Sequence, residues 1–238
     1  MKQFLNLLRL SIINHLFLPE PIWRRPHAYG YEADYITPQA FGRNTFSDRG
    51  VGAIVCTALD HFIDDITTFE WLKSQKFDPG CPNMMLGLRC IELAEFKLGN
   101  VSKPDASIRP VIGQWEVLYA MYLHNPEWYE QHRDALVVIW PPPEDYLGTR
   151  GMLLEVREIA EKRSLTKPLL AAHPEHIQRC FFIARKIFPR SPIAIDYMMD
   201  ANEKWFDPHS VQRWTRGPNV WLFYEMLTRI HHRLNGWM

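Results

Sequence analysis

The sequence lacks the short motifs that mark several large enzyme classes. It contains no GxGxxG dinucleotide fingerprint, no GxxxxGK[ST] phosphate loop, no GxSxG nucleophile elbow and no HExxH zinc motif. The four cysteines form no CxxC pair, so neither a zinc ribbon nor a thioredoxin-type site is expected. Standard NTPase, dinucleotide-dependent and serine-hydrolase interpretations therefore lose their sequence support.

An excess of either charge is also missing. Lys plus Arg and Asp plus Glu each number 27, so there is no electrostatic case for nucleic acid as a partner. No apolar run reaches the roughly 20 residues that a membrane span needs. The scattered cysteines suit free thiols in a reducing compartment. We therefore expect a cytoplasmic protein.

What the chain does contain is enough apolar material for a substantial core. It has 238 residues, of which 47% are hydrophobic and 13% aromatic. Short apolar runs that predict strands alternate with longer runs that predict helices. The expected strands cover residues 51–58, 107–112, 134–140, 168–172 and 192–197. Pro110 would place the second of these at an edge of the sheet or make it bend.

The expected helices cover residues 63–73, 84–98, 115–125, 148–163, 174–188 and 219–234. In the second helix we expect Asn83 to be the N-cap and Met84, Leu88, Ile91 and Leu98 to point inward. This alternation predicts an α/β fold: a Rossmann-like, mainly parallel sheet of about five strands with helices on both faces. Helical additions are expected at both ends of the chain.

The first 50 residues are expected to pack on an α/β domain that spans residues 51–238. Residues 1–18 have the pattern of an amphipathic helix, which either docks on the domain or lies on a membrane surface, as a peripheral contact with the inner membrane. Residues 19–50 are rich in Pro, Gly and aromatic residues and predict an ordered but irregular arm.

Polar residues recur where the predicted strands end. In open α/β sheets, ligands bind beyond the carboxyl ends of the strands, near the point where the strand order reverses. This rule gathers residues that lie far apart in the sequence into one candidate site. Its members are Asp60, His61, Gly113, Gln114, Glu144, Thr149, His173, His176, Arg179 and Asp196.

Two of the candidates lie in the loop after the third strand. Glu144 could act as a general base or accept a hydrogen bond from a ligand, and the alternative is a solvated loop carboxylate. Thr149 could bind an anion together with the backbone amides of its helix, and the alternative is a helix cap.

His176 and Arg179 lie on one face of the following helix. A histidine beside an arginine at a helix start is suited to an anionic ligand such as phosphate, and the histidine can also serve as an acid or base. The alternative is that both residues pair with Glu175 or Glu155 on the surface. No ligand spacing favours a metal, and the sequence names no cofactor.

The order of these elements resembles that of the YdcF/SanA-like family. The segments that carry the resemblance are VGAIVCTA, VIGQ, VVIWPPPEDYLGT, LLAAHPEHIQRC and WLFYEMLTRIHHRLNGW, within residues 51–238. The resemblance implies a Rossmann-like fold, a small-molecule pocket and a link to cell-envelope processes. Glu144, Thr149, His176 and Arg179 match the family's pattern. If the protein is an enzyme, we expect Glu144 and His176 to act in catalysis and Thr149 and Arg179 to bind the ligand.

Two functions remain open from the sequence. In the first, the protein binds, and acts on, a small anionic or nucleotide-like ligand; Asp60, Gln114 and His173 complete the binding residues. In the second, it is a non-catalytic interaction module that uses the aromatic residues of the arm and of the last helix: Trp23, Tyr29, Tyr31, Tyr35, Phe41, Trp221, Phe223 and Tyr224. Burial of these aromatic residues would favour the first function, and joint exposure the second. The oligomeric state is not predicted.

Overall fold

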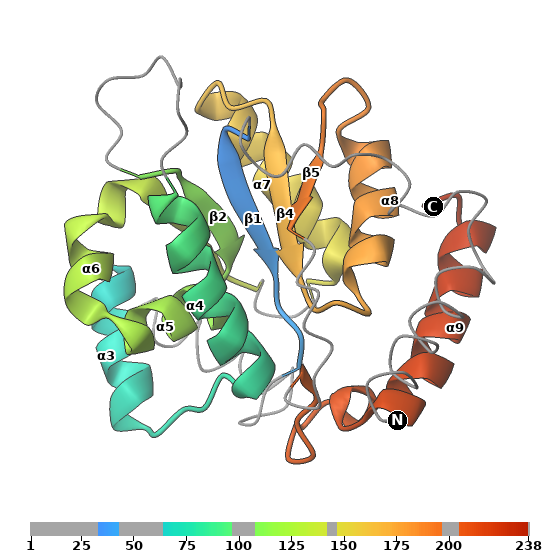
Figure 1. Ribbon diagram of the computed structural model, residues 1–238, viewed down its shortest axis with the longest axis horizontal. Helices are drawn as coiled ribbons and strands as arrows, with labels where there is room; N and C mark the ends of the chain where they lie inside the picture. The colour runs from blue at the N-terminus through green and yellow to red at the C-terminus, as the bar shows by residue number, and fades with distance from the viewer. Residues whose placement is uncertain (1–32, 43–63, 97–107, 142–146, 197–204, 238) are drawn as a thin grey trace.

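A single parallel sheet organises the protein. The computed structural model describes residues 33–42, 64–96, 108–141, 147–196 and 205–237. Its five strands lie in the order β3-β2-β1-β4-β5 (Figure 1). They are β1 (Tyr35–Gln39), β2 (Val111–Gln114), β3 (Leu136–Ile139), β4 (Pro168–Ala172) and β5 (Ala194–Asp196). The predicted α/β class and the strands expected at 134–140, 168–172 and 192–197 are confirmed.

Helices cover both faces of the sheet, as predicted. One face carries α3 (Asp65–Ser74), α4 (Cys81–Glu95), α5 (Trp115–His124) and α6 (Pro126–Gln131), and the other carries α7 (Thr149–Lys162) and α8 (Ile177–Ile187) (Figure 1). The predicted C-terminal helix is α9 (Pro218–Leu234), which lies beside α8.

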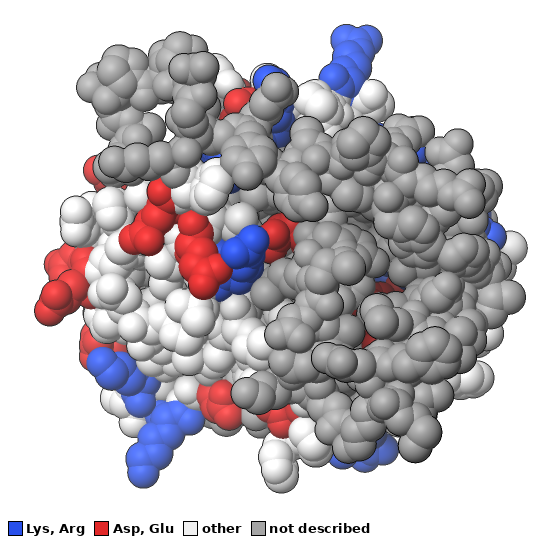
Figure 2. Space-filling model, viewed as in Figure 1, with Lys and Arg blue, Asp and Glu red and all other residues white. Residues whose placement is uncertain are grey.

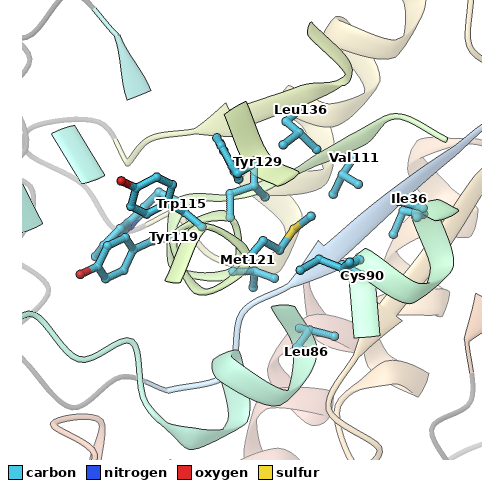
Figure 3. Close-up of a cluster of buried hydrophobic side chains, with 14 of the residues drawn as sticks. Ile36, Leu86, Cys90, Val111, Trp115, Tyr119, Met121, Tyr129 and Leu136 are labelled. Atoms are coloured by element: carbon cyan, nitrogen blue, oxygen red, sulfur yellow. The ribbon is translucent and has the colours of Figure 1, made fainter. Parts of the chain in front are cut away.

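The two faces bury separate apolar cores because successive residues of a strand point to opposite sides of the sheet. Ile36 and Val111 belong to the core beneath α3 to α6, whereas Tyr35 and Ile112 belong to the core beneath α7 and α8. The first core is rich in aromatic side chains: Phe69, Trp115, Tyr119, Tyr122, Trp128 and Tyr129. Figure 3 shows Trp115, Tyr119 and Tyr129 among them. Each such side chain contributes about 1.5–3 kcal/mol by leaving water.

The central strand lies where the sequence predicted an irregular arm. β1 pairs with β4 along five residues and with β2 at one position, Ile36 with Val111. Ile36 donates its backbone N–H to Pro110 of the β2 side, and the next residue that faces this side is Pro38, which has no N–H to donate. Because this strand contains proline and polar residues, its sequence did not indicate that it is buried. The irregular arm expected over residues 19–50 is therefore wrong for Tyr35–Gln39.

The strand expected at 107–112 begins later and is not at an edge. It is β2, which lies between β3 and β1 in the sheet. Pro110 precedes the strand and therefore removes no hydrogen bond from its ladder. Gly113 is needed in β2, because a Cβ at this position would lie 2.4 Å from Cγ of Pro38.

Two expectations for the helix at 84–98 are wrong. The helix α4 begins at Cys81 with Gly80 as its N-cap, so Asn83 lies inside its first turn. There the buried Asn83 side chain accepts from the backbone N–H of Phe41 and donates to the carbonyl of Gly42. Leu88 does not point inward, since it is 47% exposed. The strand expected at 51–58 and the helix expected at 1–18 lie outside the described residues.

Among the described residues, no helix is long and apolar enough to cross a membrane. Acidic and basic side chains are interspersed on the part of the face that Figure 2 shows in colour. Arg89 of α4 pairs with Asp196 at the end of β5 and with Glu92.

Candidate functional site

A cavity of about 440 Å³ opens at the carboxyl ends of the strands. The chain leaves β1 toward β2 and β3 on one side and adds β4 and β5 on the other, so the strand order reverses between β1 and β4. The cavity is lined by residues 40–42 after β1, Gln114 at the end of β2, residues 147–151 at the start of α7, and the start of α8. This is the place that the fold class predicts for a ligand.

The structure brings together four of the residues that the sequence proposed. Gln114, Thr149, His176 and Arg179 all line the cavity. Asp60, His61 and Glu144 lie outside the described residues. Asp196 does not line the cavity.

His173 lies next to the cavity and supports it. Its Nδ1 accepts from the backbone N–H of Glu175 at 3.1 Å, and its Nε2 lies 2.8 Å from the carbonyl oxygen of Trp205, to which it donates. Its ring stacks on Phe41 with centroids 3.8 Å apart. Both ring nitrogens are engaged, so His173 holds the strand end against neighbouring segments.

The N-terminus of α7 faces the cavity. Thr149 is the first residue of this helix, and Gly148 is its N-cap without a side-chain hydrogen bond, so Thr149 is not the cap. The first backbone N–H groups of a helix have no partner within it and carry partial positive charge. Because residues 148–151 line the cavity, this helix end favours a negative group there.

His176 is held in a single protonation state. Nη2 of Arg179 lies 3.0 Å from its Nδ1, and a guanidinium can only donate. Nδ1 is therefore the acceptor and Nε2 carries the proton, 3.3 Å from Oγ1 of Thr149. Burial, and then the charge of Arg179, lower the pKa of His176 well below its usual value. At neutral pH His176 is thus a neutral hydrogen-bond donor and not a free base.

Arg179 belongs to a buried ion cluster with α9. Its Nε donates to Oε2 of Glu225 at 2.9 Å, and Nε of Arg229 donates to Oε1 of the same carboxylate at 2.9 Å. All three side chains are at least nine-tenths buried. Two guanidinium groups therefore share the two oxygens of one carboxylate. The alternative in which His176 and Arg179 pair with carboxylates on the surface is wrong, because both residues are buried.

The lining has the electrostatic character of an anion site. Of the described residues that line the cavity, none is Asp or Glu, whereas Arg150 and Arg179 are cations. Without a carboxylate, an entering cation or metal would meet no charged acceptor in this part of the lining. The described residues also contain no group of three or more His, Cys, Asp or Glu side chains that could hold a metal ion.

An aromatic wall from the C-terminal region completes the cavity, and the sequence did not assign it to the site. Trp221, Tyr224, Thr228 and His232 lie on one face of α9, and all line the cavity. Trp214 stacks on Tyr224 with centroids 5.0 Å apart. The helical spacing of three and four residues was visible in the sequence, but nothing local placed α9 over the strand ends.

Comparisons with known proteins add no relative. No family model, no curated protein and no solved structure matches the chain. The resemblance to the YdcF/SanA-like family stays a prediction, and the function has to be inferred from the geometry of the cavity.

Proposed function

We propose that the protein binds a small anionic, nucleotide-like ligand in the cavity at the carboxyl ends of β1 and β4. One observation carries this proposal: a cavity of about 440 Å³ has two arginines and no carboxylate in its described lining and lies at the N-terminus of α7. The volume is within the range of small-molecule sites, roughly 300–1,000 Å³.

Each polar group has a distinct role in this proposal. The free backbone N–H groups of α7 and the hydroxyl of Thr149 hold the anion. His176 donates from Nε2, because Arg179 occupies Nδ1. Arg179 adds positive charge, but its fixed bonds to His176 and Glu225 make it chiefly a residue that orients His176.

A reaction at this site would need a general base in addition to the groups that bind the anion. Glu144 is the proposed general base, and it belongs to the segment that joins β3 to α7, outside the described residues. We assign His176 to ligand binding rather than to proton abstraction, since its Nε2 carries the proton. A place in the cytoplasm, a link to the cell envelope and a peripheral membrane contact through residues 1–18 follow only from the sequence and the family resemblance.

A second candidate function is a protein-interaction module, and one observation favours it. The outer face of α9 exposes an apolar stripe at a spacing of three and four residues: Val220, Phe223, Leu227, Ile230 and Leu234. However, Tyr35, Phe41 and Trp221 are buried, so they form no joint exposed aromatic surface with Phe223, and this favours the ligand-binding function. A Leu227→Glu variant that keeps its fold but loses a complex detected by light scattering would support the interaction function.

The binding proposal is tested by calorimetric titration with adenosine 5′-monophosphate and with orthophosphate. Thr149→Ala should weaken binding of both by about tenfold, because hydrogen bonds to charged groups are the stronger class. Ser191→Ala removes a hydroxyl from a different cavity and is the matched control. Equal affinity in the wild type and Thr149→Ala would show that the anion does not bind at the start of α7.

A further inference from the structure

Two buried polar groups in the cavity wall have no hydrogen-bond partner among the described residues. They are Nε1 of Trp221, whose side chain is 2% exposed, and Nδ1 of His232, which is 9% exposed. Both residues are on α9 and both line the cavity. Buried polar groups are nearly always paired in folded proteins, and a polar ligand in the cavity would supply partners for these two nitrogens.

Trp221 lies at the end of the cavity where the anion is expected. Its ring centroid is 5.7 Å from that of His176, and the guanidinium carbon of Arg179 lies 5.8 Å from the same ring centre. The indole N–H can only donate. It therefore adds one hydrogen-bond donor to the donors of α7, Thr149 and His176. Together these groups would bind the acceptor oxygens of an anion.

His232 lies farther along α9, beside a second aromatic residue. Its ring centroid is 5.3 Å from that of Trp237, and the guanidinium carbon of Arg150 also lies 5.3 Å from the centre of the Trp237 ring. Burial, and then the charge of Arg179, lower the pKa of His232 to about 4, so the ring is neutral at neutral pH. A neutral imidazole nitrogen meets a polar atom of a ligand as donor or acceptor, without a charge.

We propose that the ligand is a mononucleotide-sized organic phosphate, whose phosphate meets Trp221 and the start of α7 while its heteroaromatic ring lies against Trp237 and bonds His232. This inference rests on the proposed anion site and adds the class of the ligand. The flat faces of Trp214 and Trp237 suit stacking, which is tolerant of the identity of the base. The polar edge of a base supplies the partner that Nδ1 of His232 lacks.

The end of β2 argues against a dinucleotide. In dinucleotide-binding sheets an acidic residue after the second strand accepts from the ribose hydroxyl. Here Gln114 ends β2, and its side-chain oxygen already accepts from the backbone N–H of Ala40 at 2.9 Å. The position that needs an acidic acceptor for a ribose hydroxyl therefore holds an uncharged amide, whose oxygen already accepts a hydrogen bond.

The wild-type protein tests the inference without any substitution. Calorimetry would compare orthophosphate, ribose 5-phosphate and the 5′-monophosphates of adenosine, guanosine, cytidine and uridine. At least one nucleotide should bind about tenfold tighter than ribose 5-phosphate, because only nucleotides carry the ring. If ribose 5-phosphate binds as tightly as every nucleotide, the ring is not recognised and this inference fails, although the anion site stands. If no phosphate binds, the proposed function itself fails.

Two conservative variants distinguish recognition of the phosphate from recognition of the heteroaromatic ring. Trp221→Phe keeps the ring but removes the N–H, and should weaken ribose 5-phosphate and nucleotides alike, by about three- to tenfold. His232→Phe keeps an aromatic ring but removes both ring nitrogens, and should weaken the binding of nucleotides by a similar factor while leaving the binding of ribose 5-phosphate unchanged. Circular dichroism and thermal melts establish that each variant folds. A His232→Phe variant that loses ribose 5-phosphate binding to the same extent would overturn the proposed orientation.

Discussion

In the described part of the chain, two cavities of similar size lie at opposite ends of the same two helices. The cavity of about 440 Å³ includes the start of α7 and the start of α8, and the cavity of about 370 Å³ includes Arg157, Ala160 and Glu161 near the end of α7, and Ile187 at the end of α8. The helix dipole therefore favours an anion in the first cavity and opposes one in the second.

The ion pairs also differ between the two cavities, because the pair in the second is exposed and the pair that Arg179 forms in the first is buried. The second cavity has an Arg157–Glu161 pair with side chains 44% and 71% exposed, a kind of pair that contributes little. In the first cavity, the lining residue Arg179 belongs to a buried cluster in which it shares Glu225 with Arg229. Volume alone does not distinguish the cavities. Buried groups with fixed proton positions do, and they are the reason that we propose the first cavity as the ligand site.

The largest expected effect on stability is at Glu225. Glu225→Gln removes the carboxylate that bonds both Arg179 and Arg229, which should lower the free energy of unfolding by about 3 kcal/mol. Glu161→Gln at the other cavity is the matched control and should change it by less than about 0.5 kcal/mol. Urea denaturation of both variants measures the difference. Equal, small effects would show that the cluster does not distinguish the two ends.

The pH dependence of stability should also reflect the first cavity. The pKa of His232 is about 4 in the fold, below its unfolded value of about 6.5, so the unfolded chain binds the proton more tightly. Its contribution is present above pH 6.5 and is lost as the pH falls toward 4, by about 2 kcal/mol at pH 5. His176 acts in the same direction.

His232→Phe should therefore flatten the decrease in stability between pH 6.5 and 5, and the exposed His231→Phe is the control. Denaturant titrations at a series of pH values give the slope. A slope that His232→Phe leaves unchanged would contradict the assignment of a neutral buried imidazole.

A smaller effect is expected where β1 meets the cavity. Gly42 has φ +70°, and a Cβ there would lie 2.6 Å from Oγ1 of Thr215. Gly42→Ala should cost about 1–3 kcal/mol of stability, from the strained backbone and the close contact. Gly217→Ala, where a Cβ would meet nothing within 4 Å, should cost much less. Thermal melts that rank the two variants equally would show that the loop after β1 does not need this geometry.

Whether a part of the site could be predicted from the sequence depends on how far apart in the sequence its interacting residues lie. Strand β4 was predicted with its observed bounds, because a continuous apolar run ended by His173 is a local pattern. The rule about strand ends then brought Gln114, Thr149, His176 and Arg179 to one place. Arg179 and His176 are three residues apart, so their contact also follows from helical spacing.

The parts that were missed depend on long-range packing. β1 is buried by its neighbours β2 and β4 although its sequence, YITPQ, has no apolar run. The partner of Arg179 is Glu225, 46 positions away on α9. No local pattern indicates that α9 crosses the strand ends, and therefore the sequence did not identify Trp221 and His232 as part of the cavity wall.

The most direct test of the anion site is a nuclear magnetic resonance spectrum of the protein with ¹⁵N-labelled histidine, recorded at pH 7 with and without ribose 5-phosphate. The account predicts that His176, assigned through its loss in His176→Gln, is neutral with the proton on Nε2, and that the phosphate shifts this Nε2 resonance. The Nδ1 signal should change little, because Arg179 occupies it. A charged His176, a proton on Nδ1, or an Nε2 resonance that saturating phosphate leaves unchanged would contradict the account.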